Sequence, residues 1–203
     1  VETAGTLENY ISADEKEKLI GLKLTGKLNT FDYDFMRTMS ALESVDLAQI
    51  DNTTIPASCF KESTVKTVIL PLNLEAIPDN AFSNSSITSI DIPSSVVSIG
   101  NSAFESCTSL AGNLILPNGL QSIGDNAFRL CKKLTGDLRI PNSVINLGHH
   151  AFNNCGFTAL PLGTGITAIP QYCFSNGYSF TGNLIIPDQV EVIEEGAFRS
   201  CTF

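Results

Sequence analysis

Hydrophobic and polar residues alternate along most of the chain in one recurring pattern. The clearest unit, Ile87 to Cys107, reads I-x-x-I-x-I-P-x-x-V-x-x-I-G-x-x-A-F-x-x-C, where most x positions are polar. Its phenylalanine recurs at intervals of 22 or 24 residues, at Phe60, Phe82, Phe104, Phe128, Phe152, Phe174 and Phe198. A fixed period of this length is typical of solenoids, whose stacked coils bury one continuous core. We therefore expect the seven rings to form a single interior column.

Each unit predicts a short strand, a turn and a return segment. The I-x-I triplet alternates with period two, as in a strand with one buried face. A proline follows it and ends strand pairing, since proline has no N–H to donate. Val96 and Ile99 exemplify the return side. In-register stacking then predicts one parallel sheet with neighbouring strands about 4.8 Å apart.

The first 20 residues predict a helical cap at the end of the stack. Ser12 and Glu15 have the spacing of a capping box, followed by Lys16–Ile20. Residues 21–203 are then one continuous solenoid of about eight coils, the last one incomplete. The expected strand centres are 22, 45, 68, 90, 114, 138, 160 and 184. A helix is expected over Tyr33–Leu42, with Phe35, Met39 and Leu42 on its buried face.

The repeat unit resembles the BspA-like, or Treponema-pallidum-type, bacterial leucine-rich repeat over roughly residues 55–203. The segments LIGLKLTGKLN and DFMRTMSALESVDLA resemble the amino-terminal part of surface proteins with this repeat from gut Bacteroides-type bacteria. Departures are Gly163 in the proline slot and Ser63, Ser85 and Gly177 in the cysteine slot. The resemblance implies a right-handed leucine-rich-repeat fold with a parallel β-sheet on the concave face.

The same resemblance implies an exported protein, extracellular or on the cell surface, often lipid-anchored. Some members bind host extracellular-matrix proteins or other bacteria, and no catalytic residues come with the family. The chain begins at Val1 rather than Met, so we expect any export signal or anchor to have been removed before it. It holds no stretch of about 18 apolar residues that would span a membrane. The net charge of −9 disfavours nucleic acid as a partner.

The six cysteines invite a metal or disulfide interpretation. Cys107, Cys131, Cys155 and Cys201 lie three residues after a repeat phenylalanine, and Cys59 and Cys173 lie one residue before one. There is no C-x-x-C, and no histidine has ligand spacing. We favour a buried column of free thiols packed as small apolar groups, with neither metal nor cofactor. A disulfide between stacked coils remains a less favoured alternative.

Other catalytic motifs are weak. His149-His150 and Glu194-Glu195 are most simply solvated loops. Gly21–Lys27 nearly spells a phosphate-binding loop, but Leu28 occupies the position where Ser or Thr should bind magnesium. No G-x-S-x-G elbow is present. Paired carboxylates acting as a glycosidase remain a distant alternative, and we expect no enzymatic activity.

The outward side of the predicted sheet is the candidate binding face. The residue between the two buried positions of each strand points outward, giving Lys23, Asp46, Ile69, Asp91, Ile115, Arg139, Pro161 and Ile185. The column two residues earlier is Gly21, Ser44, Thr67, Ser89, Asn113, Asp137, Ala159 and Asn183. Exposed isoleucines among charges are typical of protein-binding surfaces. However, β-branched residues also simply suit strands, so both explanations stay open.

These patterns lead to a functional hypothesis. The chain is a non-catalytic adhesion module that engages a protein or glycan through the concave face. Its candidate contact residues are Lys23, Asp46, Ile69, Asp91, Ile115, Asp137, Arg139, Asn183 and Ile185. The alternative is a structural spacer, or stalk, that displays another domain. The pattern indicates neither the partner nor the oligomeric state.

Overall fold

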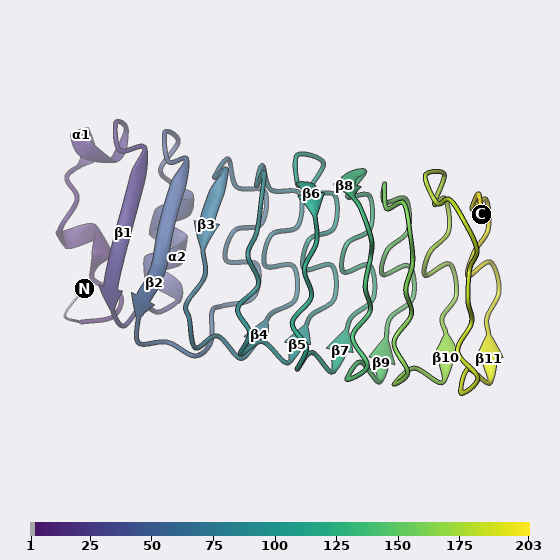
Figure 1. The fold of residues 1–203 in the computed structure, drawn as a ribbon. Coiled ribbons are helices and arrows are strands. Elements are labelled where there is room, and N and C mark those ends of the chain that lie inside the picture. Colours follow the sequence, from purple (N-terminus) through teal and green to yellow (C-terminus); the bar gives the residue numbers. More distant parts are fainter. Residues whose placement is uncertain (1–2) are drawn as a thin grey trace.

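The chain forms an elongated solenoid of about eight coils, and the computed structural model describes residues 3–203. Residues 1 and 2, the start of the predicted cap, lie outside the described residues. The two termini lie at opposite ends of the stack (Figure 1). The helical elements are η1 (Leu7–Asn9), α1 (Ala13–Lys16) and α2 (Thr30–Arg37). The strands are β1 (Gly21–Gly26), β2 (Ser44–Ile50), β3 (Thr67–Ile69), β4 (Ala76–Ile77), β5 (Ser98–Ile99), β6 (Ala111–Asn113), β7 (Ser122–Ile123), β8 (Lys133–Thr135), β9 (Asn146–Leu147), β10 (Ala168–Ile169) and β11 (Val192–Ile193).

The strand side of the stack is regular only in its first three coils. β1, β2 and β3 pair in parallel, and Leu22, Val45 and Val68 lie in register as expected. Beyond β3, pairing at the predicted strands is reduced to isolated bridges, such as Thr67 with Ser89. The predicted parallel arrangement is therefore confirmed, but on this side its ladder is continuous only from β1 to β3. The physical reason is the recurring proline, which removes a ladder donor in the later coils and is absent from β1 and β2.

The longer coils differ further from the expected pattern. β6 and β8 pair with each other and lie just before the predicted strand centres 114 and 138. Both overlap the two-residue insertions that lengthen these units to 24 residues, and Asn113 faces Thr135 rather than Asp137. The inserted residues thus carry the pairing that we had assigned to the following triplets.

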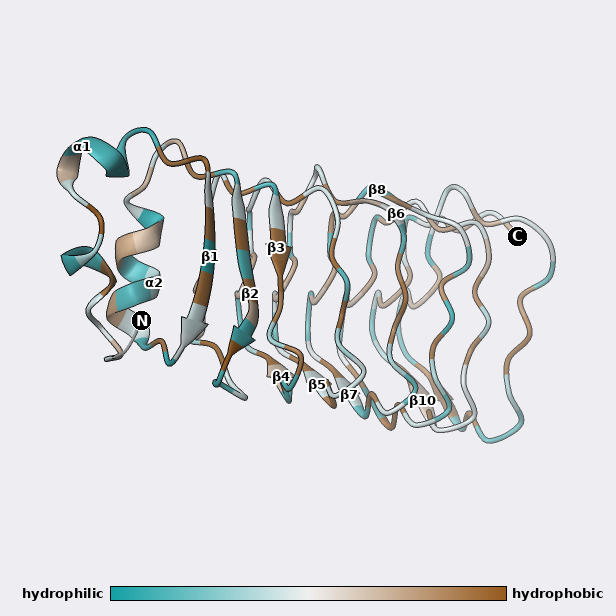
Figure 2. Cartoon of the chain, turned by 60° about the vertical axis from the view of Figure 1, so that its left-hand side comes forward, coloured by the Kyte–Doolittle hydropathy of each residue, from teal (hydrophilic) through white to brown (hydrophobic). Residues whose placement is uncertain are grey.

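The return side forms a second parallel ladder. β4, β5, β7 and β9 pair in sequence, and β10 pairs with β11. Figure 2 shows hydrophobic segments along these coils, and Ile77, Ile99, Ile123 and Ile169 are all buried. The apolar pairs that the sequence assigned to the return side therefore close the core opposite β1–β3.

The seven periodic phenylalanines form one interior column, as predicted; we call it the phenylalanine ladder. Successive rings are stacked with centroids 4.9 to 5.8 Å apart and planes within 10° of parallel. At the amino-terminal end, Tyr33 meets Phe60 edge-on, with centroids 5.9 Å apart. At the other end, Phe203 meets Phe198 edge-on at 6.0 Å. Offset stacks and edge contacts are both favourable arrangements of aromatic rings.

Backbone hydrogen bonds join the coils along this ladder. The Phe82 N–H donates to Ala103 O at 2.7 Å, and Asn80 and Asn84 donate likewise to the next coil. Every ladder phenylalanine has a left-handed residue two positions before it and another two positions after it, mostly Asn or Ser. Asn adopts this conformation more readily than most side chains do. The repeated left-handed pair therefore aims alternate N–H groups at the neighbouring coil.

The cysteines are buried thiols with hydrogen bonds. All six are free, and five are buried, Cys201 being half-buried. The Cys107 thiol donates to Phe82 O at 3.0 Å, and the Cys131 thiol donates to Phe104 O at 3.1 Å. These thiols therefore satisfy carbonyls as well as filling space, which the sequence interpretation missed. Burial raises the pKa of the Cys59 thiol to about 12, so it resists forming a reactive thiolate.

The amino-terminal cap begins as expected. Ser12 and Glu15 form the predicted capping box at α1, but that helix ends at Lys16. α2 starts at Thr30 and ends at Arg37, earlier than the predicted range, because Asn29 and Asp32 form a second capping box. Its buried face carries Tyr33 and Met36 rather than the expected phenylalanine, which is only partly buried.

Close approach between coils requires glycine at position 148. A Cβ on Gly148 would overlap the Gly124 carbonyl carbon and the Asp125 amide nitrogen, both main-chain atoms. We expect Gly148→Ala to lower the free energy of unfolding by about 1–3 kcal/mol, since the coils must separate to admit the methyl group. Urea unfolding followed by circular dichroism measures this. Gly119→Ala is the control, because a Cβ there meets no atom within 4 Å; equal losses would contradict the packing argument.

Candidate functional site

The strand face, defined here as the outward side of β1–β3 and of the equivalent segments in later coils, displays the predicted columns. Ile69, Ile115 and Ile185 are 49%, 74% and 75% exposed. Lys23, Asp91, Arg139 and Asn183 are also exposed, whereas Asp46 and Asp137 are half-buried. The structure therefore places all nine predicted residues on one accessible face.

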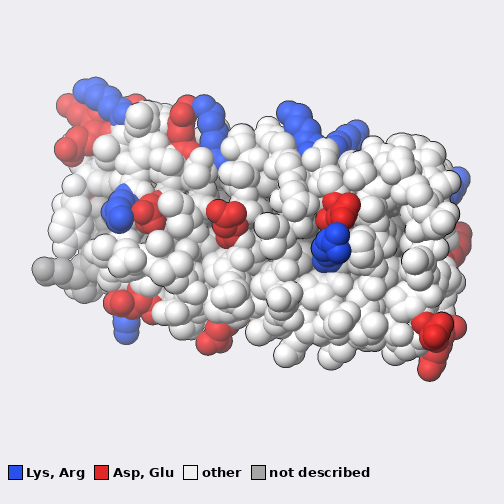
Figure 3. Space-filling view, viewed as in Figure 1, with Lys and Arg blue, Asp and Glu red and all other residues white. Residues whose placement is uncertain are grey.

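Charges on the strand face are few and largely paired with each other. Lys23 Nζ lies 3.4 Å from Asp46 Oδ2, which joins β1 to β2. Arg139 donates to Asp137 Oδ2 at 2.7 Å within one coil. Asp91 forms no ion pair with any described residue. Figure 3 shows this face as mostly uncharged, with isolated charged spots across its middle. The face is therefore close to neutral although the whole chain is acidic.

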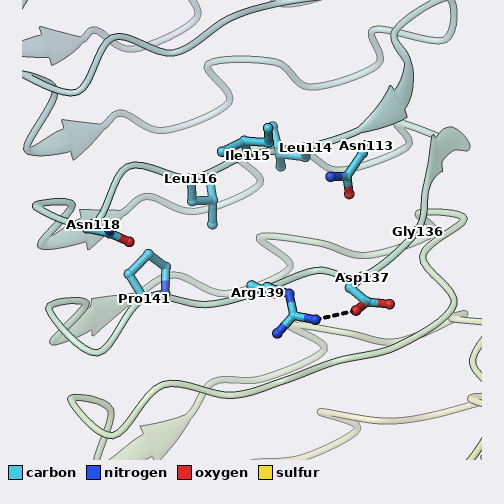
Figure 4. Close-up of a pocket in the computed structure, with 9 residues that line it drawn as sticks. All are labelled: Asn113, Leu114, Ile115, Leu116, Asn118, Gly136, Asp137, Arg139 and Pro141. Carbon is cyan, nitrogen blue, oxygen red and sulfur yellow. Dashed lines mark hydrogen bonds and ion pairs between the residues drawn. The ribbon is translucent and has the colours of Figure 1, made fainter.

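Three hollows interrupt the strand face. The first, about 450 Å³, contains Ile115, Leu116, Asn118, Asp137 and Arg139 in its lining. In Figure 4, Asn118 and Pro141 lie at one end of it, and the Asp137–Arg139 pair lies at the other.

The other two hollows repeat this arrangement. One, about 300 Å³, is lined in part by Ile69 and Asp91. The other, about 380 Å³, is lined in part by Asn183 and Ile185. Every predicted contact residue beyond β2 thus lines a hollow, and each hollow contains one of the three exposed isoleucines.

The hollows lie between every second pair of coils. The boundary between the first hollow and the one at Ile185 is closed by backbone bonds, since Leu138 N donates to Ala159 O at 2.9 Å and Ile140 N donates to Pro161 O at 3.0 Å. The sequence analysis did not anticipate hollows. The available signal was the run of prolines, because strands that lose ladder donors leave space between side chains.

The remaining candidates from the sequence have structural roles. His149 Nδ1 lies 3.5 Å from Glu194 Oε2, and the His150 ring stacks on Tyr172 with centroids 5.1 Å apart. Burial lowers the pKa of His150. The Glu194 carboxylate accepts from the Gln171 N–H at 2.9 Å. Non-covalent contacts therefore join these loops to the neighbouring coils, so the loops are not simply solvated.

Two further features bear on chemistry. The segment that resembles a phosphate-binding loop is strand β1, whose Leu24 is buried. No three or more His, Cys, Asp or Glu side chains in residues 3–203 are placed to hold a metal ion.

No helix within residues 3–203 is long and apolar enough to cross a bilayer.

Comparison with known proteins agrees with this geometry. The family described as "BspA type Leucine rich repeat region" matches residues 15–111 and 111–203, with six copies of the repeat. The chain belongs to the BspA-type leucine-rich-repeat family. The resemblance noted in the repeat unit is thus confirmed. No curated protein is significantly similar to the chain in sequence.

The chain is also similar to solved structures of bacterial leucine-rich-repeat proteins. The leucine-rich-repeat protein of T. pallidum is 26% identical with a TM-score of 0.65, covering 90% of this chain and 81% of that one. A Bacteroides ovatus leucine-rich-repeat protein is 22% identical with a TM-score of 0.51, covering 92% and 65%. A leucine-rich cell surface protein of Faecalibacterium prausnitzii is 20% identical with a TM-score of 0.48, covering 90% and 71%.

Proposed function

We propose that the chain is a non-catalytic binding module that engages a protein partner through the strand face. The observation that carries this proposal is the placement of Ile69, Ile115 and Ile185 in hollows on a face whose charges are mostly paired. Protein interfaces are typically depleted of charge at their centre and contain anchors that fill pockets. Leucine-rich repeats generally mediate protein interaction.

The family resemblance supports a location outside the cell. We propose that the chain works at the cell surface and that its partner is a host extracellular-matrix protein. Antibody labelling of intact source cells tests the location. Labelling only after lysis would contradict it.

The contact face is tested by replacing its most exposed anchor and the adjacent cation. Immobilised chain is presented with a panel of purified extracellular-matrix proteins and, separately, with a glycan array. We expect the double variant Ile115→Ala and Arg139→Ala to lower capture of the bound protein about tenfold or more, equivalent to about 1.4 kcal/mol. The unfolding midpoint should not change, because both side chains are exposed.

The control carries the same changes outside the hollows. Ile145, which is 60% exposed, and Arg199 are replaced by alanine, and we expect capture to be unchanged. Equal capture by both double variants would rule out the strand face as the contact surface. Capture of glycans alone would replace the protein partner with a carbohydrate. Wild-type chain that captures neither would favour the spacer alternative.

A further inference from the structure

The turn beside the first hollow contains an Asn-Gly dipeptide in an open position. Leu120 N donates to Pro117 O at 3.0 Å, so Asn118 and Gly119 are the two central residues of a β-turn. Both are exposed, and a Cβ on Gly119 would meet no atom within 4 Å. Within residues 3–203, neither the Asn118 side-chain amide nor the Gly119 N–H has a hydrogen-bond partner.

We propose that Asn118 is a site of spontaneous deamidation. The Gly119 amide nitrogen loses its proton and attacks Asn118 Cγ, forming a C–N bond while the side-chain nitrogen leaves as ammonia. The five-membered succinimide then takes up one water, which opens either carbonyl to give aspartate or isoaspartate. Groups that are held close react intramolecularly with a large advantage. Glycine adds no Cβ to obstruct this ring closure and permits the backbone rotation that it needs.

The next coil provides an internal comparison at the same turn position. Val144 N donates to Pro141 O at 3.1 Å, so Asn142 occupies the place that Asn118 has in its own turn. Its Oδ1 accepts from the Thr164 N–H at 3.0 Å, and the following residue is Ser143. Asn142 is therefore held by the neighbouring coil and followed by a side chain.

The second Asn-Gly dipeptide, Asn176-Gly177, has the same two residue types as Asn118-Gly119 but different surroundings. Asn176 Oδ1 accepts from the Tyr178 hydroxyl at 2.9 Å. A Cβ on Gly177 would overlap the Phe180 ring, so this glycine is tightly packed. Gly177 O also accepts from the Phe180 N–H. The same two residues are thus restrained here, and only Asn118 combines the reactive dipeptide with an open turn.

Deamidation changes the first hollow directly. Asn118 lines it together with Ile115 and Arg139, and Figure 4 shows the three residues around the same space. The reaction adds one negative charge where the Asp137–Arg139 pair is now balanced. In isoaspartate the main chain runs through Cβ and Cγ, so the Asn118 main-chain carbonyl, which accepts from the Ser143 hydroxyl at 2.7 Å, leaves the main chain and becomes a free carboxylate. A consequence for partner capture rests on the proposed function; the modification itself does not.

The experiment follows the modification by mass. The full chain is incubated at mildly alkaline pH, and peptide mapping that distinguishes isoaspartate from aspartate quantifies each asparagine over time. We expect Asn118 to react at least about tenfold faster than Asn142 and Asn176, where tenfold corresponds to about 1.4 kcal/mol of activation free energy. Gly119→Ala should slow the reaction at Asn118 by a similar factor without lowering stability. Equal rates at the three asparagines, or an unchanged rate in Gly119→Ala, would overturn the proposal.

A second measurement keeps the two proposals apart. Asn118→Asp supplies the added charge without any reaction, and its capture of the matrix protein that the panel identifies is compared with that of the wild type. We expect a several-fold change. An unchanged value would separate the modification from binding, while the mass measurement would still decide whether deamidation occurs.

Discussion

Phe128→Ala is expected to lower the free energy of unfolding by about 3–5 kcal/mol, the usual cost of emptying a buried aromatic site. The ring is fully buried, and its centroid lies 4.9 Å from that of Phe104 and 5.3 Å from that of Phe152. Both neighbours are fixed by backbone bonds between coils, such as Phe104 N to Ala127 O at 2.7 Å. The surrounding structure therefore has little freedom to collapse into the space. Urea unfolding followed by circular dichroism measures the loss.

Phe31→Ala is the matched control for the buried ring. Phe31 is 76% exposed on α2, so its truncation should change stability by no more than about 0.5 kcal/mol. A loss below about 1 kcal/mol for Phe128→Ala would show that the phenylalanine ladder contributes little to the stability of the stack.

Asp32→Ala should cost about 3 kcal/mol or more, because one buried carboxylate organises the amino-terminal cap. Asp32 is 1% exposed, and its oxygens accept from the N–H groups of Gly5 at 2.6 Å, Leu7 at 2.9 Å and Asn29 at 2.9 Å. Alanine leaves these donors without the acceptor, and each unsatisfied buried group costs about 1–3 kcal/mol. Urea unfolding measures the total, and hydrogen exchange of the three amides should accelerate.

Asp34→Ala separates this effect from the loss of any helix carboxylate. Asp34 lies on the same helix, with its side chain 59% exposed and 3.7 Å from Arg37. Exposed ion pairs contribute about 0–1 kcal/mol, so its removal should be nearly neutral. Similar losses for the two aspartates would indicate that the helix as a whole, rather than the buried acceptor, sets the stability of the cap.

The sequence predicted the register of the stack because its strongest signal is periodic. Phe60 to Phe198 occupy one slot of the repeat, and one slot must become one column when the coils lie in register. The same argument placed Ile69, Ile115 and Ile185 on the exposed side of the strands, where the structure has them. Their role in binding stays a prediction.

The remaining features depend on how neighbouring coils meet. Pro117 and Pro141 indicate where a strand ends. The size of the hollow between two coils, however, depends on the side chains of both coils. The left-handed pair around each phenylalanine is equally hard to read, since Glu62, Leu130 and Tyr172 adopt it alongside Asn and Ser. In these positions the hydrogen bonds between coils override local preference.

The direction of the inter-coil bonds determines how the molecule responds to load. Backbone bonds such as Phe82 N to Ala103 O and the ring stacks both join one coil to the next, along the axis of the stack. Tension between the termini therefore loads these boundaries in series, so that they break one at a time rather than resisting together. A coil that peels away releases 22 or 24 residues, roughly 75 Å of slack when extended. Pulled from its ends, the chain would lengthen in steps of one coil, and each step would lower the force transmitted between the two ends.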